Sequence, residues 1–95
     1  MSDVTIKSAR RVFEVLEYFD TMRTPLSLKQ ICDQHGYPPS SGAAILKSLV
    51  MLGYLEYDKR SRTYLPTMRI AALGGWVVTE LFGGMNIIGL METLR

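Results

Sequence analysis

The sequence predicts a mainly α-helical fold with a small β-hairpin, and two patterns support this prediction. Three segments between residues 8 and 52 repeat apolar side chains every three or four residues, as amphipathic helices do. Two short aromatic segments then flank a polar stretch at residues 58–62, which is typical of a hairpin. The chain has 95 residues, of which 47% are hydrophobic and 21% are charged, so it can bury one small core.

The first predicted helix covers residues 8–19. Its apolar stripe consists of Val12, Val15, Leu16 and Phe19. Arg10 and Arg11 fall outside this stripe, where they are free either to contact DNA or to pair with Glu14 one turn along the helix. Thr24 and Pro25 interrupt the pattern, because a proline disfavours helical backbone in the residue before it.

Two further helices follow, joined by a short connection. Ser27, with Gln30 three residues later, is typical of a capping box, so the second helix should begin there and end at Gly36. The third helix should cover residues 40–52 and end at Gly53. Its inward-facing residues should be Gly42, Ile45, Leu46 and Leu49.

The segment after the third helix is predicted to form the hairpin. Residues 54–57 and 63–65 are the expected strands, and Pro66 should end the second one. Residues 58–62 form the turn, which carries three basic side chains and is either a solvated loop or a contact with nucleic acid. The tyrosines at positions 54, 57 and 64 are expected to pack within the hairpin and core rather than to stack on bases.

The last third of the chain is apolar and rich in glycine. Residues 74–95 contain five of the eight glycines and only three charged side chains. We expect two helices, at about 68–82 and 85–95, rather than a membrane span, because Glu80 interrupts the apolar run and adjacent glycines break it. Such an apolar surface predicts a homodimer interface, formed by Leu73, Trp76, Val77, Leu81, Phe82, Ile87, Ile88 and Met91.

The order of these elements is helix, helix, short turn, helix and hairpin, which is a winged helix-turn-helix. In this arrangement the last helix of the pair enters the major groove, and the hairpin, or wing, offers cations to phosphates or to the minor groove. We therefore expect double-stranded DNA as the partner. The candidate DNA-contacting residues are Arg10, Arg11, Ser40, Ser41, Ala44, Lys47, Lys59, Arg60 and Arg62.

One stretch resembles a known family closely. Residues 36–55 read GYPPSSGAAILKSLVMLGYL, which is similar to the recognition-helix motif of IclR-type transcriptional regulators, and Asp58 follows where that motif has an aspartate. Residues 8–16 (SARRVFEVL) and 69–74 (RIAALG) resemble the family's first helix and its exit segment. The family usually has lysine where this chain has Pro39 and arginine where it has Ala44, so Lys47 is the one charged side chain left on the recognition helix.

The resemblance implies a winged helix-turn-helix followed by linker and dimerisation helices. Residues 1–66 would be the DNA-binding domain, and residues 67–95 would be the linker and the start of an effector-sensing domain. A small-molecule effector is expected only if such a domain follows in a longer protein. The implied function is a dimeric DNA-binding transcriptional regulator.

The residues give little evidence for a metal site, an enzyme or a membrane protein. Cys32 and His35 are the single cysteine and histidine, so a Cys/His zinc site or disulfide framework is excluded, and no cofactor is expected. No arrangement of catalytic groups or Gly-rich phosphate loop is present, which argues against an enzyme. The N-terminus lacks an apolar signal core, so we expect a cytoplasmic protein without membrane attachment. The alternative that stays open is a winged-helix module that binds another protein instead of DNA.

Overall fold

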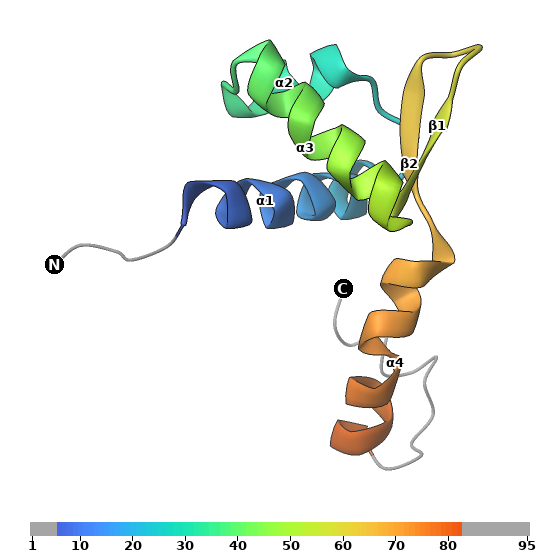
Figure 1. Cartoon of the computed structure of the whole chain (residues 1–95). Coiled ribbons are helices and arrows are strands. Elements are labelled where there is room, and N and C mark those ends of the chain that lie inside the picture. Colours follow the sequence, from blue (N-terminus) through green and yellow to red (C-terminus); the bar gives the residue numbers. More distant parts are fainter. Residues whose placement is uncertain (1–5, 83–95) are drawn as a thin grey trace, which may run out of the picture.

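The computed structural model describes residues 6–82, which form four helices and one two-stranded antiparallel sheet (Figure 1). In chain order the elements are α1 (Lys7–Met22), α2 (Leu28–His35), α3 (Pro39–Leu52), β1 (Leu55–Asp58), β2 (Thr63–Pro66) and α4 (Met68–Phe82). The predicted winged helix-turn-helix is therefore confirmed. The tip of the hairpin and α4 point in opposite directions from the body made by α1, α2 and α3 (Figure 1).

The helix ends follow local chemistry. Ser27 and Gln30 form the predicted capping box, in which the Ser27 side chain accepts from the Gln30 amide and the Gln30 side chain accepts from the Ser27 amide. Gly36 and Gly53 end α2 and α3 in the left-handed region, with φ of 74° and 90°. The first helix runs three residues further than predicted, because Arg23 adopts the left-handed cap (φ 54°) that ends it.

The hairpin is close to its predicted position. Tyr57 pairs with Tyr64 across β1 and β2, and Pro66 pairs with Leu55 as the last residue of β2 rather than standing after it. The sequence did not predict that a further segment pairs with the hairpin. Leu26, before α2, exchanges two backbone hydrogen bonds with Tyr64 (3.1 and 2.8 Å), so the loop after α1 is attached to the outer side of β2.

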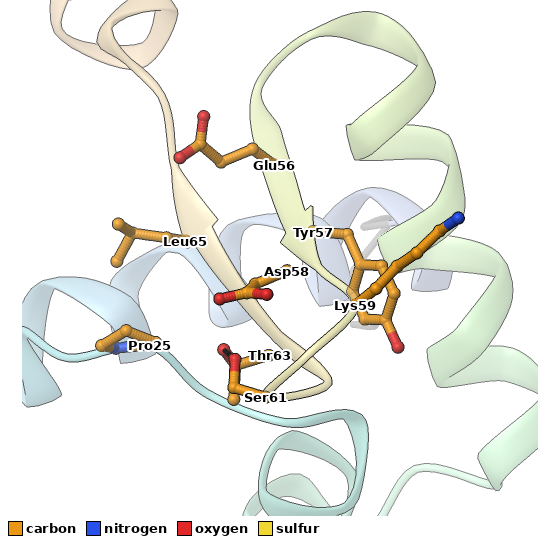
Figure 2. Close-up of a pocket in the computed structure, with 8 residues that line it drawn as sticks. All are labelled: Pro25, Glu56, Tyr57, Asp58, Lys59, Ser61, Thr63 and Leu65. Carbon is orange, nitrogen blue, oxygen red and sulfur yellow. Dashed lines mark hydrogen bonds between the residues drawn. The ribbon is translucent and has the colours of Figure 1, made fainter.

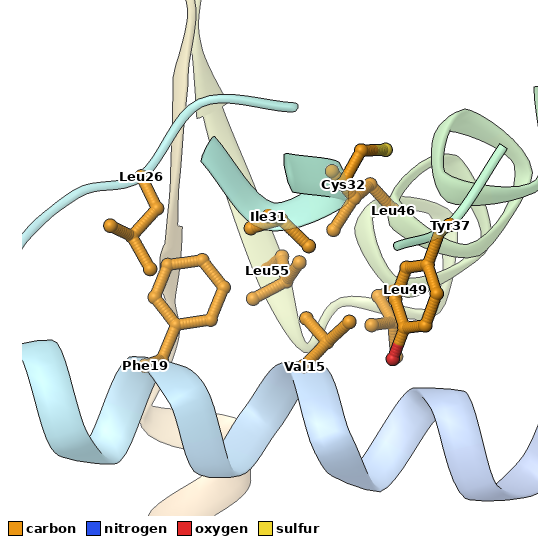
Figure 3. Packing of buried hydrophobic residues seen from close by; sticks show 9 residues of the cluster. All are labelled: Val15, Phe19, Leu26, Ile31, Cys32, Tyr37, Leu46, Leu49 and Leu55. Atoms are coloured by element: carbon orange, nitrogen blue, oxygen red, sulfur yellow. The ribbon is translucent and has the colours of Figure 1, made fainter. Parts of the chain in front are cut away.

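The core lies where α1, α2, α3 and β1 meet (Figure 3). Its buried members are Val15, Phe19, Leu26, Ile31, Cys32, Tyr37, Leu46, Leu49 and Leu55. Every α3 residue predicted to face inward is buried or half-buried. Burial, and secondarily the carboxylate of Asp33, raises the pKa of the Cys32 thiol, so this side chain packs in the core as a neutral thiol.

Helix α4 begins at the predicted place and is tied to the body at its first turn. The hydroxyl of Thr67 donates to the carbonyl of Gly53 (2.6 Å), and the Arg69 guanidinium lies over the Tyr54 ring (5.2 Å). Beyond this turn Leu73, Trp76 and Leu81 are exposed and Val77 is half-buried. The side chain of Phe82, the interface candidates Ile87, Ile88 and Met91, and the helix predicted at 85–95 lie outside the described residues. Among residues 6–82 no helix is long and apolar enough to cross a bilayer.

Candidate nucleic-acid interface

The exposed face of α3 is a continuous strip directly opposite its buried face. Ser40, Ala44, Lys47 and Met51 follow one another at spacings of four, three and four residues, so they lie on one side of the helix. All four are exposed, and Met51 is 77% accessible. Gly42, Leu46 and Leu49 are buried on the other side. We call these four exposed residues the α3 strip.

A groove separates the α3 strip from the start of α1. Its α1 side is formed by Ile6, Lys7, Ser8 and Arg11, and its α3 side by Ser41, Ala44 and Ile45. Two cations, Lys7 and Arg11, therefore stand one helical turn apart beside the N-terminal half of the strip. A phosphate beside this groove would meet both positive side chains together with the Ser41 hydroxyl.

Arg11 is held in place by an aromatic contact with the turn between α2 and α3. Its guanidinium lies 4.9 Å from the centre of the Tyr37 ring, and the Tyr37 hydroxyl donates to the Glu14 carboxylate (2.5 Å). The His35 ring also stacks on Tyr37, with ring centres 4.9 Å apart. Burial and the hydrogen bond to Glu14 raise the pKa of Tyr37. This cluster joins α1 to the connection that sets the angle of the helix-turn-helix.

Glu14 also faces Arg10, as the sequence allowed. The Arg10 guanidinium lies 3.8 Å from the Glu14 carboxylate, and both side chains are partly exposed. Such a surface pair contributes little stability, so Arg10 can leave it at small cost.

A second groove lies between the α3 strip and the hairpin. It is lined by Ala43, Lys47, Val50 and Met51 from α3 and by Tyr57 and Tyr64 from the hairpin. The two tyrosine rings contact each other, with centres 4.7 Å apart, which confirms that they pack within the hairpin. Burial, and then the neighbouring Tyr57, raises the pKa of Tyr64.

The hairpin separates its charges between two faces. Tyr57 and Lys59 point toward α3, whereas Glu56 and Asp58 point to the side of Pro25 and Leu65 (Figure 2). All six residues line one pocket around the hairpin. Alternation of side chains along β1 produces this segregation. The acidic groups of the hairpin are thereby kept off the surface that carries the α3 strip.

The basic tip of the hairpin is ordered by its own hydrogen bonds. The Asp58 carboxylate accepts from the Arg60 amide (2.9 Å), and the Asp58 carbonyl accepts from the Arg62 amide (2.7 Å). Arg62 occupies the left-handed region with φ of 58°. Lys59, Arg60 and Arg62 are all exposed, so their side chains are available to a partner.

The structure thus arranges the sequence candidates in three groups. Ser40, Ala44 and Lys47 lie on the α3 strip; Arg11 and Ser41 lie in the groove beside α1, with Arg10 one residue away; and the three wing cations lie at the hairpin tip. Lys7, Met51 and Tyr57 also line the two grooves and were not among the sequence candidates for DNA contact. The position of Lys7, four residues before Arg11, was the one local signal that could have included it.

Comparison with known proteins decides the family. A family model described as the IclR helix-turn-helix domain matches residues 8–59, which is more than half of the chain. The chain belongs to the IclR helix-turn-helix family. This IclR domain is accordingly a winged helix-turn-helix of the DNA-binding kind, as the motif at residues 36–55 predicted.

Solved structures agree with this assignment. An IclR family transcriptional regulator from Brucella abortus superposes with a TM-score of 0.72 and 28% identity, over 80% of this chain and 29% of that one. HmgR from Pseudomonas aeruginosa shares the fold at a TM-score of 0.64 and 20% identity, over 88% of this chain and 33% of its own. The IclR domain therefore spans about a third of the length of these proteins. No protein of curated function matches the sequence.

Proposed function

We propose that this IclR domain binds double-stranded DNA by inserting α3 into the major groove. The observation that carries the proposal is the α3 strip, an exposed helical face with a groove on each side. Lys7 and Arg11 line one groove, and Lys47 of the strip lines the other. A helix that enters the major groove needs an unobstructed face directed at base edges and positive groups flanking it at the level of the phosphates. In this proposal Ser40, Ala44 and Lys47 face the bases.

The flanking cations would bind the backbone. Arg10, Arg11 and Ser41 would contact phosphates on the α1 side, and Lys59, Arg60 and Arg62 would contact the backbone or minor groove through the wing. The clamp of Arg11 on Tyr37 favours this role, because a side chain that is already positioned loses less conformational freedom on binding.

The domain would act as a homodimer joined through α4. Leu73, Trp76, Val77 and Leu81 lie at spacings that place them on one stripe of this helix, and most of that stripe is exposed in the single chain. A second copy related by a two-fold axis would cover it and would bring two copies of α3 to half-sites about 34–36 Å apart. Residues 67–95 would then serve as linker and dimerisation region, after a DNA-binding domain at residues 1–66.

A salt titration of binding to duplex DNA tests the proposal. The logarithm of the association constant should fall with the logarithm of salt concentration by about 0.9 per phosphate contact. The wing variant Lys59→Gln/Arg60→Gln/Arg62→Gln should reduce the slope by about 2–3, and Lys47→Ala should weaken binding. Arg23→Gln is the matched control, because Arg23 is a cation at the far end of α1 that pairs with Asp20.

A slope near zero, or equal slopes for the wing variant and the unchanged domain, would contradict the proposal. A slope near zero would favour the alternative in which the same surface binds a protein partner. Equal slopes would exclude the wing from the contact, since loss of phosphate contacts must release fewer counterions.

A further inference from the structure

The inference concerns which base pairs α3 recognises, and it rests on the proposed function. We infer that the α3 strip selects A·T pairs by apolar contact with the C5-methyl group of thymine, with Ala44 and Met51 as the specificity-determining residues. Ala44 and Met51 stand seven residues apart, two turns along the same face, and Lys47 lies between them.

Hydrogen-bonded readout has few donors available on this helix. The sequence of α3 contains no arginine, asparagine or glutamine, so Lys47 is its one side chain of the kinds that recognise guanine or adenine through two hydrogen bonds. The Ser48 hydroxyl already donates to the Ala44 carbonyl inside the helix (2.8 Å). Within α3, Lys47 is the one cationic side chain.

What the α3 strip offers instead is apolar surface. Ala44 presents a methyl group to solvent, and Met51 exposes most of a long thioether side chain on a face directed away from the core. An exposed methionine at the end of a groove lined by Ala43 and Tyr57 is unfavourable in water, and it gains by meeting an apolar group. In the major groove the only such group is the thymine methyl.

Lys47 completes the recognition of the same base. Thymine displays its O4 acceptor next to the C5-methyl group, so the ammonium can donate to O4 while Ala44 or Met51 contacts the methyl. This pairing needs a cation beside an apolar surface, and Lys47 has an apolar residue on either side along the α3 strip.

The test replaces thymine by uracil, which pairs with adenine in the same way and keeps O4 but lacks the methyl group. A binding site is first selected from a pool of random duplexes with the full chain. Each thymine of that site is then replaced singly by uracil, and Kd is measured at fixed salt. We expect a loss of about three- to fivefold at the thymines under α3, which is the effect of withdrawing one methyl from an apolar contact, and no loss at uracils placed in the flanks.

Variants assign the effect to residues. In Met51→Gln and Ala44→Ser the difference between thymine and uracil should shrink to less than twofold at one thymine each. Met68→Gln, at an exposed methionine of α4, should keep the full difference. Melting temperatures of all three variants confirm that the domain still folds.

The two proposals fail in different ways. Equal Kd values for the thymine and uracil sites, or a selected half-site without thymine, would overturn the inference while leaving DNA binding intact. Absence of salt-dependent DNA binding would overturn the proposed function itself.

Discussion

At the scale of single residues, Gly42 shows how closely the two helices of the motif approach. A Cβ placed on Gly42 would overlap the Sγ of the buried Cys32 and would lie 3.3 Å from the Leu28 side chain. The glycine has ordinary helical backbone, so its role is to make room for α2 rather than to adopt a special conformation. Its contact with Cys32 was not visible in the sequence, which showed only that position 42 faces inward.

Gly42→Ala should therefore destabilise the domain although alanine is the better helix former. We expect a loss of about 1–3 kcal/mol from overpacking, against a gain of about 1 kcal/mol in helix propensity, measured by urea unfolding. Cys32→Ala removes the overlapping sulfur, so Gly42→Ala should cost much less in the Cys32→Ala background. Equal costs in both backgrounds would show that the Cys32 contact is not the cause.

Tyr37 makes a pH-dependent contribution to stability. Its pKa is raised in the folded domain, so the contribution is complete below the ordinary tyrosine pKa of about 10 and is lost as pH rises toward the folded value. Tyr37→Phe removes the hydrogen bond to Glu14 and should cost about 1 kcal/mol at pH 7. Between pH 7 and 10.5 this variant should lose less stability than the unchanged domain. Tyr57→Phe, at an exposed tyrosine of the hairpin, is the control. Equal stability of Tyr37→Phe and the unchanged domain at pH 7 would contradict the role given to the Tyr37–Glu14 hydrogen bond.

Among the secondary-structure elements, the hairpin contains two arginines that carry the same charge but differ in backbone conformation. Arg60 and Arg62 are both exposed cations of the hairpin tip, but only Arg62 has a positive φ. A side chain with a Cβ is strained by about 1–2 kcal/mol in that region, whereas glycine is not.

Replacing each of these two arginines by glycine should therefore have opposite effects on the stability of the domain. Arg62→Gly should keep or raise the melting temperature, and Arg60→Gly should lower stability by about 0.5–1 kcal/mol through the added freedom of the unfolded chain. Both should reduce the salt slope of DNA binding by about 0.9, because each removes one cation. Thermal unfolding and a salt titration on the same samples measure both effects. Equal changes in stability would show that the strain at Arg62 is negligible.

At the scale of the whole molecule, the single tryptophan reports on the proposed dimer. Trp76 is 67% exposed in the isolated chain and is the only tryptophan of the sequence. If α4 pairs with a second copy, raising the protein concentration should shift its fluorescence to shorter wavelength as the indole leaves water.

Substitutions on α4 test the same interface. Leu73→Arg should abolish the concentration-dependent shift and give a monomer in sedimentation, because a charge would be buried in the apolar stripe. Thr79 is exposed on the same helix but lies outside the stripe, so Thr79→Arg should keep the concentration-dependent fluorescence shift and the dimer. A dimer that persists in Leu73→Arg would place the interface elsewhere.

Prediction from sequence succeeded where the cause was local. The capping box at Ser27, the glycines that end α2 and α3 and the inward face of α3 all depend on residues within a few positions of one another. It failed for contacts that join distant segments. The bridge from Leu26 to Tyr64 spans 38 residues, and the Tyr37–Glu14 hydrogen bond spans 23; no periodicity or spacing reports such contacts.

Spacing, capping and motif in the sequence were enough to predict the elements, their order, the family and the list of cations. Folding places some of those cations around α3 together with Lys7, Met51 and Tyr57, and it turns Glu56 and Asp58 to the other side of the hairpin. The physical reason is packing. The directions in which α1 and the hairpin meet α3 are set by the buried contacts of Val15, Leu46 and Leu55, and those directions decide which side chains share a surface.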